Sequence, residues 1–335
     1  MQYYKKHSIK KLFLLKFLTL FKIQIMSLLV VGTVAFDAIE TPFGKTDKIV
    51  GGAATYICHS AAYFYDNIHL VSVVGEDFPK EYIDLFEKRN ICTKGLQIKE
   101  GEKTFFWAGK YHIDMNSRDT VATELNVLEH FNPVIPNHVK SPSYVMLGNL
   151  TPAVQLSALE QLESKPKLVV LDTMNFWMDT ALDDLLKVLK KVDVLTINDE
   201  EARQLSNEYS LVKAARKILE MGPKYLVIKK GEHGALLFND ANHVFFAPAL
   251  PLEEVFDPTG AGDSFAGGFI GYLAATNDTS YENMKRAVIY GSAMASFTVE
   301  KFGTERLIGL SKEEVEERIQ EFINLVQFDI SLVNS

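Results

Sequence analysis

The chain is most readily understood from one stretch, Asp257-Pro258-Thr259-Gly260-Ala261-Gly262-Asp263, which leads directly into an apolar segment. Pro258 restricts its own φ angle, and Gly260 and Gly262 allow the backbone to turn and to approach a ligand closely. The following residues, 265–275, have the length and apolar content of a buried helix. Because the first N–H groups of a helix lack partners within it and the helix dipole is positive there, this stretch predicts an anion site.

One acid, Asp263, lies at this anion site and can be interpreted in two ways. Aspartate is a favoured N-cap residue, so its side chain could simply cap the helix. A cap, however, needs no glycines before it, and Gly260 and Gly262 are then unexplained. The alternative is a catalytic carboxylate that accepts a proton from a hydroxyl group while the N–H groups of the turn hold a transferring phosphoryl group.

Length and composition indicate an ordinary globular protein. The 335 residues, 47% of them hydrophobic, suffice for one large α/β domain with a small lid, or for two modest domains. The formal net charge of -8 argues against a nucleic-acid-binding protein. Two cysteines, Cys58 and Cys92, form neither a disulfide framework nor a recognisable metal motif, so a reducing, cytoplasmic compartment is expected.

The first 25 residues differ from the rest of the chain. They carry six lysines among leucine, phenylalanine and isoleucine, and they contain no acid. The lysines interrupt every apolar run, so no signal-peptide core forms, and we predict a basic extension that comes from an early start or forms a loose tail. A helix lying on a membrane surface is the alternative. The main domain is then predicted to span residues 26–328, without a membrane partner.

Short apolar runs alternate with helical patterns along most of the chain. Residues 27–32 predict a fully buried first strand, as in a parallel sheet, and residues 69–74 predict another. From residue 143 the alternation becomes regular, which is typical of a doubly wound sheet. The other predicted strands are 144–147, 168–171, 192–197 and 225–228, with a hairpin at 235–238 and 244–246. The predicted helices are 78–89, 152–163, 178–190, 199–205, 281–298 and 312–325, besides one opened by Gly51-Gly52.

Polar residues follow several predicted strands at the point where each strand ends. Because the carboxyl ends of parallel strands share one edge of a sheet, we expect these side chains to line a common crevice. They are Asp37, Asn149, Asp172, Asn175, Asn198 and Glu201.

A second, smaller sheet is predicted outside the main layer, from about residues 36–48 and 91–113. In the latter, residues 97–99 and 105–107 flank Glu100-Gly101-Glu102, as in a hairpin. The aromatic residues here, which include Phe105 and Trp107, could stack on a ligand or pack a lid or subunit interface, and packing is the preferred interpretation. A homodimer through this lid is therefore expected.

These motifs together resemble the ribokinase-like carbohydrate kinases, the PfkB family. The resemblance rests on Asp257–Asp263 with Gly267-Gly268 in the helix after it, and it spans about residues 27–325. Four further motifs occur in the family's order: Asp37, Gly51-Gly52, Asn198-x-x-Glu201 and Gly231-x-x-Gly234. It implies a Rossmann-like three-layer α/β/α sandwich with a mostly parallel sheet and a small β lid. It also implies transfer of the γ-phosphoryl group of ATP to an alcohol.

The resemblance also implies a role for each matching residue. Asp263 would be the general base, and the N–H groups of Gly260, Ala261 and Gly262 would form the anion hole. The residues that would hold the acceptor's hydroxyls are Asp37, Gly51 and Gly52. Those that would lie along ATP are Asn198, Lys229, Gly231, Gly234 and Gly303. Glu201 would organise Mg²⁺ through water, and Asp257 and Thr259 match positions that bind a monovalent cation such as K⁺ in some members.

One position departs from the family pattern. The family usually has an asparagine four residues after the second glycine, where it contacts the acceptor; this chain has Tyr56, which is expected to take this substrate-binding position. Asn175 is then expected to help bind the substrate, as is Arg118. The leading hypothesis is a kinase of a sugar or sugar-like small molecule; the alternatives are a nucleoside kinase, with Phe105 or Trp107 stacked on the base, and a catalytically silent sugar-binding regulatory protein. A dinucleotide oxidoreductase is disfavoured because no Gly-x-Gly-x-x-Gly follows the first strand.

Overall fold

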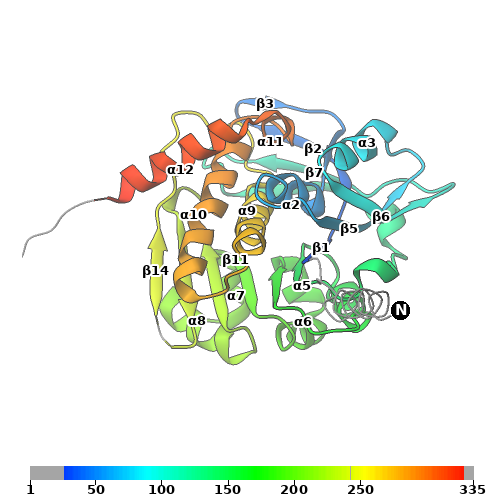
Figure 1. The fold of residues 1–335 in the computed structure, drawn as a ribbon. Helices are drawn as coiled ribbons and strands as arrows, with labels where there is room; N and C mark the ends of the chain where they lie inside the picture. The colour runs from blue at the N-terminus through cyan, green and yellow to red at the C-terminus, as the bar shows by residue number, and fades with distance from the viewer. Residues whose placement is uncertain (1–25, 242, 328–335) are drawn as a thin grey trace, which may run out of the picture.

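The computed structural model describes residues 26–241 and 243–327, so the predicted extension at 1–25 lies outside the described part. The fold is built on a nine-stranded sheet with the order β14-β13-β12-β11-β10-β9-β1-β5-β6 (Figure 1). In chain order the strands of this main sheet are β1 (Leu28–Val31), β5 (Ile68–Gly75), β6 (Ile91–Lys99), β9 (Tyr144–Leu147), β10 (Leu168–Asp172), β11 (Val194–Asn198), β12 (Tyr225–Lys229), β13 (Ala235–Asn239) and β14 (Val244–Ala247).

The strands from β6 to β12 all run parallel, and β13 and β14 add the predicted antiparallel hairpin at one edge. Strands β1 and β9 are buried at every residue. A parallel strand covered on both faces has no solvent side, which explains why these segments appear in the sequence as unbroken apolar runs.

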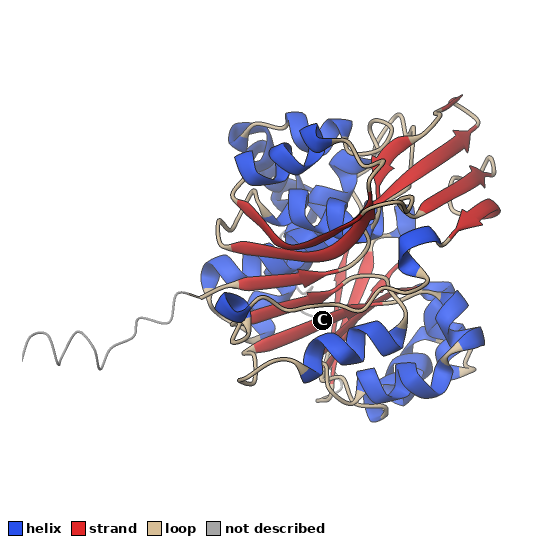
Figure 2. Ribbon diagram, turned by 90° about the vertical axis from the view of Figure 1, so that its right-hand side faces the viewer, coloured by secondary structure: helices blue, strands red, loops and turns tan. Residues whose placement is uncertain are grey.

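Helices cover both faces of the main sheet (Figure 2), which confirms the predicted sandwich. Along β1, Leu28 and Val30 pack into one core and Leu29 and Val31 into the other, because successive side chains of a strand point to opposite faces. The first core includes helices α2 (Ala53–Ala61), α3 (Lys80–Lys88), α9 (Ala261–Thr276) and α10 (Tyr281–Thr298). The second includes α4 (Pro152–Glu160), α5 (Asn175–Thr180), α6 (Leu182–Leu189), α7 (Asp199–Ser206) and α8 (Leu211–Glu220).

Glycines let helix α9 lie unusually close to its neighbours. A β-carbon on Gly267 would lie 2.4 Å from the carbonyl oxygen of Ile57 in α2, and one on Gly268 would lie 2.9 Å from that of Tyr290 in α10. Helix α9 is thereby held between two helices, and its N-terminus is placed at the carboxyl-end edge of the main sheet. Helices α11 (Glu305–Gly309) and α12 (Lys312–Val326) complete this side of the molecule.

A five-stranded second sheet stands outside the main layer (Figure 2). Its order is β3-β2-β7-β8, with β4 paired to β2. The strands are β2 (Ala35–Thr41), β3 (Gly44–Lys45), β4 (Ile49–Gly51), β7 (Phe106–Tyr111) and β8 (Arg118–Glu124).

The hairpin predicted across residues 97–107 is wrong. Strand β6 pairs in parallel with β5 in the main sheet, whereas β7 pairs in parallel with β2 in the second sheet. The connection between them is held by acids of the β5–α3 loop: Asp77 accepts from the N–H and hydroxyl of Thr104, and Glu76 accepts from the N–H of Gly101. Of the segment 91–113 predicted for the second sheet, only β7 therefore belongs to it, and β6 belongs to the main sheet.

Three smaller differences concern β8, α8 and the helix predicted at 178–190. Strand β8 was not predicted, because it is mostly polar and exposed and shows no apolar face. Helix α8 was not predicted either, and the helix expected at 178–190 is two helices that meet at Ala181, whose φ of -145° is not helical. No helix within 26–241 and 243–327 is both long and hydrophobic enough to cross a membrane.

Candidate active site

Three strands of the main sheet end at one edge in ionisable or amide side chains. Asp172 ends β10, Asn198 ends β11 and Lys229 ends β12, so the parallel register brings them side by side. The ammonium of Lys229 lies 2.8 Å from the Oδ2 atom of Asp172, and both side chains are largely buried. Side chains predicted to line a common crevice therefore meet around a buried ion pair, and we refer to this region at the carboxyl ends of the strands as the crevice.

Lys229 also acts on two further acids of the crevice. Burial alone would lower its pKa, but the charges of Asp172, Glu201 and Asp263 together raise it, so its ammonium stays protonated. It points toward the turn before α9, since a β-carbon on Gly262 would lie 3.0 Å from its Nζ atom. One cation thus lies among three acids at the mouth of helix α9.

The turn before α9 has the geometry that its glycines predict. Gly260 is the N-cap with a φ of 75°, a conformation that costs glycine little. The N–H of Ala261 donates to the carbonyl of Pro258, and that of Ser264 donates to the carbonyl of Gly260. Among the described residues, the N–H groups of Gly262 and Asp263 have no acceptor, so they can bind an anion.

Asp263 does not cap the helix. It lies in the first turn of α9, after the N-cap residue, and no side chain caps this helix. Burial, followed by the charge of Asp172, raises the pKa of Asp263 to about 7, and Lys229 partly opposes this. A carboxyl group with a pKa near neutrality can both accept and release a proton at physiological pH, as a general base must.

A second carboxylate, Asp37, faces the crevice from strand β2. Its Oδ2 atom accepts a hydrogen bond from the N–H of Gly52 at 3.4 Å, and burial raises its pKa to about 7. Gly51 makes room for it, because a β-carbon there would lie 1.9 Å from Oδ2. The predicted acceptor-binding set, Asp37, Gly51 and Gly52, is therefore one compact group whose charge also raises the pKa of Asp263.

The pair Asn198 and Glu201 forms a capping box at the start of α7. The Asn198 side chain accepts from the N–H of Glu201, and a carboxylate oxygen of Glu201 accepts from the N–H of Asn198, both at 2.8 Å. Burial raises the pKa of Glu201 to about 7. Its other carboxylate oxygen makes no hydrogen bond to the described residues, so this carboxylate retains a lone-pair donor suited to Mg²⁺ or its water.

Gly231 and Gly234 form a turn directly after β12, with φ angles of 55° and 80°. A β-carbon on Gly231 would lie 2.5 Å from the Oδ1 atom of Asn116, which belongs to the β7–β8 connection of the second sheet. The second sheet therefore reaches across the crevice to this turn.

Asp257 connects the turn before α9 to the loop at Gly303. Its side chain is completely buried, and its two oxygens accept from the N–H groups of Thr259 at 2.8 Å and Gly303 at 2.9 Å. Burial raises its pKa, although these hydrogen bonds oppose the shift. The hydroxyl of Thr259 contacts that of Tyr111 at 3.1 Å, which joins this loop to strand β7.

Tyr56 lies beneath the turn before α9. It is 1% exposed, and a β-carbon on Gly260 would lie 2.4 Å from its ring. Its hydroxyl has no hydrogen-bond partner among the described residues. Burial and the charges of Asp37, Asp257 and Asp263 hold the pKa of this hydroxyl well above its usual value. Tyr56 thus supports the turn with its ring, and its hydroxyl is unsatisfied.

The positions of several further residues relative to the crevice were less evident from the sequence. Asn175 starts α5, where it is exposed and accepts from the N–H of Phe176, and it makes no hydrogen bond to the crevice residues described above. Arg118 of β8 lowers the pKa of Asp263 and Glu201, so its charge acts on the crevice. Trp107 is the register partner of Asp37 and therefore shares its face of the second sheet. The pairing of Asp172 with Lys229 had no sequence signal.

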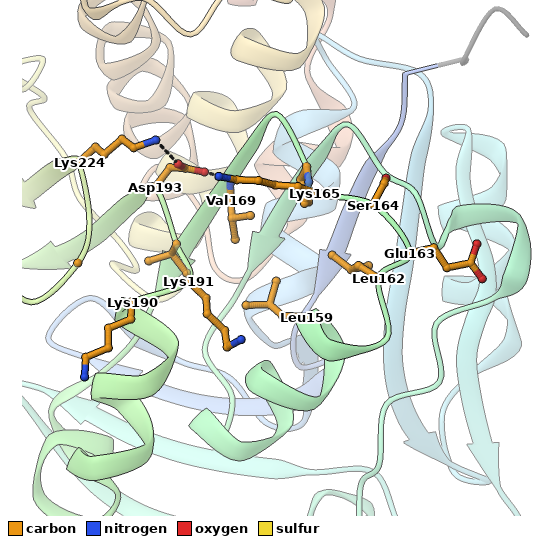
Figure 3. A pocket seen from close by; sticks show the side chains of 13 residues that line it. Leu159, Leu162, Glu163, Ser164, Lys165, Val169, Lys190, Lys191, Asp193 and Lys224 are labelled. Carbon is orange, nitrogen blue, oxygen red and sulfur yellow. Dashed lines mark hydrogen bonds and ion pairs between the residues drawn. The ribbon is translucent and has the colours of Figure 1, made fainter.

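A separate hollow of about 410 Å³ lies at the amino ends of β10, β11 and β12, far along the strands from the crevice (Figure 3). The ion pair between Lys224 and Asp193 stands at its side. None of the crevice residues named above lines it.

Comparison with known proteins matches the chain to one family and to relatives that are kinases. The family described as pfkB family carbohydrate kinase matches residues 27–308. A cytidine kinase of Thermococcus kodakarensis is 32% identical over 251 residues, which is 73% of this chain and 87% of that protein. A nucleoside kinase of Methanothermobacter thermautotrophicus is 28% identical over 318 residues, which is 86% of this chain and 94% of that protein.

Solved structures share the fold. A nucleoside kinase of Methanocaldococcus jannaschii, described as an archaeal member of the ribokinase family, superposes with a TM-score of 0.72 at 24% identity, covering 88% of this chain and 99% of its own. A ribokinase of Arabidopsis thaliana complexed with ribose and ATP gives 0.71 at 18% identity with the same coverage. These likenesses establish the architecture on which the crevice is built.

Proposed function

The chain belongs to the pfkB family of carbohydrate kinases, and from this premise we propose that Asp263 activates a nucleoside hydroxyl for attack on ATP. The protein is an ATP-dependent kinase of a sugar or nucleoside. The observation that carries the proposed role is the position of Asp263 beside the free N–H groups of α9, with a pKa of about 7. A protein that only binds sugars would need no such base.

We infer that residues of the crevice carry the proton transfer of this reaction and part of its charge neutralisation. Asp37, with Gly51 and Gly52, holds the acceptor so that one hydroxyl faces Asp263, which takes its proton as the oxygen attacks the γ-phosphorus. A new P–O bond forms and the bond to ADP breaks, while the amides of α9 and the ammonium of Lys229 face the developing charge. Most of the acceleration comes from this positioning and neutralisation of charge.

ATP is proposed to lie along Asn198, Lys229, Gly231 and Gly234, with its base near Gly303. Gly231 supports this, because it follows β12 at the carboxyl-end edge and a side chain there would meet Asn116 of the second sheet. Mg²⁺, held through water by Glu201, would neutralise phosphate charge. A monovalent cation such as K⁺ is proposed at the Asp257–Thr259 loop, whose carboxylate and hydroxyl oxygens suit a hard cation.

A nucleoside is the acceptor that the second sheet favours. Trp107 lies on the same face as Asp37, and we infer that its ring stacks on a base attached to the bound ribose. The two relatives described above as cytidine and nucleoside kinases agree with this choice. We infer that the second sheet forms a lid over this site. Its exposed outer strand β8 is a surface on which a homodimer could form.

An ADP-release assay with ATP and Mg²⁺ tests the acceptor class. Stacking of one base contributes about 1–3 kcal/mol, so cytidine or another nucleoside should be used about 10–100-fold better than ribose. Trp107→Leu should remove most of this advantage and leave turnover of ribose unchanged. Better use of ribose or a hexose than of any nucleoside would assign the enzyme to sugars, and no turnover on any acceptor would favour the silent regulatory protein.

Gly51→Ala should weaken acceptor binding without unfolding the protein. The new β-carbon would overlap the Asp37 carboxylate, and this short side chain can rotate away from it. Loss of a charged hydrogen bond to the acceptor costs about 1.5–3 kcal/mol, so kcat/KM for the acceptor should fall about 10–100-fold while KM for ATP changes little. Gly309→Ala is the control, because a β-carbon there meets nothing within 4 Å. Equal kinetics in the two variants would exclude Asp37 from acceptor binding.

The pH dependence of kcat/KM should show the raised pKa values of the crevice. Asp263 must be unprotonated to accept a proton, so kcat/KM should fall as pH drops below about 7, measured between pH 5.5 and 8.5. The apparent value belongs to interacting carboxyls, because the pKa of Asp37 is also raised to about 7. A flat profile down to pH 5.5 would contradict the assignment.

Protonation of these buried carboxyls does not itself unfold the protein at low pH. A carboxyl whose pKa is higher in the folded protein binds protons more tightly there than in the unfolded chain. The contribution of Asp37, Glu201 and Asp263 to stability is therefore greatest below about pH 4 and declines as pH rises toward about 7. As pH falls through this interval, protonation of these three groups lowers activity but raises stability. Measuring kcat/KM and Tm separately therefore distinguishes the two effects.

A further inference from the structure

Three side chains that can ligate metals meet far from the kinase crevice. They are His69 in β5, Cys92 in β6 and His138 in the 3-10 helix η2 (Asn137–Val139), and one potential ligand atom from each lies within 4.8 Å of the other two. The Sγ atom of Cys92 lies 3.8 Å from the Nε2 atom of His138. His69 and Cys92 are register neighbours at the second position of two adjacent parallel strands. The cluster is therefore at the amino ends of the strands, opposite the crevice.

Hydrogen bonding around His69 prepares one of its nitrogens for a cation. The Nδ2 group of Asn67 donates to the carbonyl of Met26 at 2.8 Å, which directs the Oδ1 atom of Asn67 toward the Nε2 atom of His69 at 3.0 Å. His69 must then carry its proton on Nε2, so Nδ1 has a free lone pair. The Nδ1 atom is buried and has no partner among the described residues.

This arrangement of outer partner and free nitrogen is the one that metal-binding histidines usually have: the second ring nitrogen donates to a fixed oxygen, which sets the tautomer. Burial, with smaller effects of His138 and Lys94, lowers the pKa of His69 to about 4, so its ring is neutral at pH 7. An empty site would leave a buried polar atom unsatisfied, which costs free energy.

We propose that His69, Cys92 and His138 form a binding site for Zn²⁺ at the edge of the main sheet. Imidazole and thiolate are the ligands that Zn²⁺ prefers, and tetrahedral Zn²⁺ places a sulfur and a nitrogen ligand about 3.5 Å apart, close to the separation of Cys92 and His138. Hard cations such as Mg²⁺ prefer oxygen ligands and are not expected here. Three protein ligands leave the fourth position open to water.

The bound ion would join three segments that are distant in sequence. Strand β6 is the edge strand of the main sheet, and η2 belongs to the long connection that precedes β9. Zn²⁺ would hold both against β5 and stabilise this edge, because a ligand that binds only the folded chain shifts unfolding in its favour. Its effect is on stability, since the cluster contributes no residue to the crevice.

Cobalt substitution of the full-length, reduced, metal-free protein tests the proposal without relying on kinase activity. Co²⁺ added in the absence of ATP should give a thiolate-to-cobalt absorption band at one equivalent per chain, and Zn²⁺ should abolish the band. Zn²⁺ should also raise Tm. Cys92→Ser and His138→Gln should lose the band and the rise in Tm, and His138 lies on an exposed turn where substitution leaves the fold intact.

Matched variants separate this site from general binding by histidines. His130→Gln, an exposed histidine outside the cluster, should keep full cobalt binding. Asn67→Leu removes the outer partner of His69, together with the hydrogen bond to the Met26 carbonyl, and should weaken binding about 10–100-fold. Absence of the band in the wild-type protein, or its persistence in folded Cys92→Ser or His138→Gln protein, would overturn the proposal.

Discussion

Asp263→Asn is expected to reduce kcat by about 10²–10⁴-fold, the usual contribution of a positioned general base, while the affinity for ATP stays close to that of the wild type. Asparagine has nearly the shape of aspartate but cannot take the hydroxyl proton. The proposed nucleotide contacts at Asn198 and Gly231 are unchanged. Steady-state ADP release and ATP titration by calorimetry measure the two quantities separately.

Stability distinguishes this loss from unfolding. The charge of Asp263 is unfavourable in the folded protein, because burial and the neighbouring charge of Asp172 both oppose it. Removing that charge should leave Tm at pH 8 unchanged or higher. Asp184→Asn is the control, since Asp184 is exposed on α6 and only pairs with Lys187. Turnover of Asp263→Asn within tenfold of the wild type would rule out Asp263 as the base.

Lys229→Met is expected to lower the free energy of unfolding by about 3–5 kcal/mol, because it leaves Asp172 as an uncompensated buried charge. The two side chains are only 16% and 8% exposed, so water cannot replace the lost ammonium well. Urea unfolding followed by circular dichroism measures the change. Turnover should fall as well, since Lys229 faces the mouth of α9, and the pH profile should move to higher pH because Lys229 lowers the pKa of Asp263.

Two controls test this explanation: substitution of the ion-pair partner Asp172, and disruption of an ion pair on the surface. Adding Asp172→Asn to Lys229→Met should recover part of the lost stability, because no charge is then left unpaired. Lys187→Met breaks the exposed pair with Asp184 and should cost no more than about 1 kcal/mol. If Lys229→Met costs as little as Lys187→Met, the crevice is more hydrated than its burial indicates and the pair does not stabilise the fold.

Much of the fold could be predicted because a parallel strand buried on both faces appears in the sequence as an unbroken apolar run. Strands such as β1 and β9 are apolar at every position, and the Asp257–Asp263 stretch is rich in glycine where the backbone turns into α9. Strand β8 could not be recognised from the sequence, because both of its faces are mostly polar. The partner of β6 was assigned wrongly because its contacts are with β5, and sequence proximity to β7 suggested a hairpin instead.

The sequence by itself predicted the glycine turn at the start of α9, most strands of the main sheet and the polar residues at their carboxyl ends, since each depends on local conformation and short-range hydrophobic pattern. Only the tertiary structure decided that Lys229 pairs with Asp172, that Trp107 lies beside Asp37, and that His69, Cys92 and His138 meet. It also raised the pKa of Asp263 to about 7. These properties arise from burial and from charges on different strands, and no local pattern in the chain encodes either.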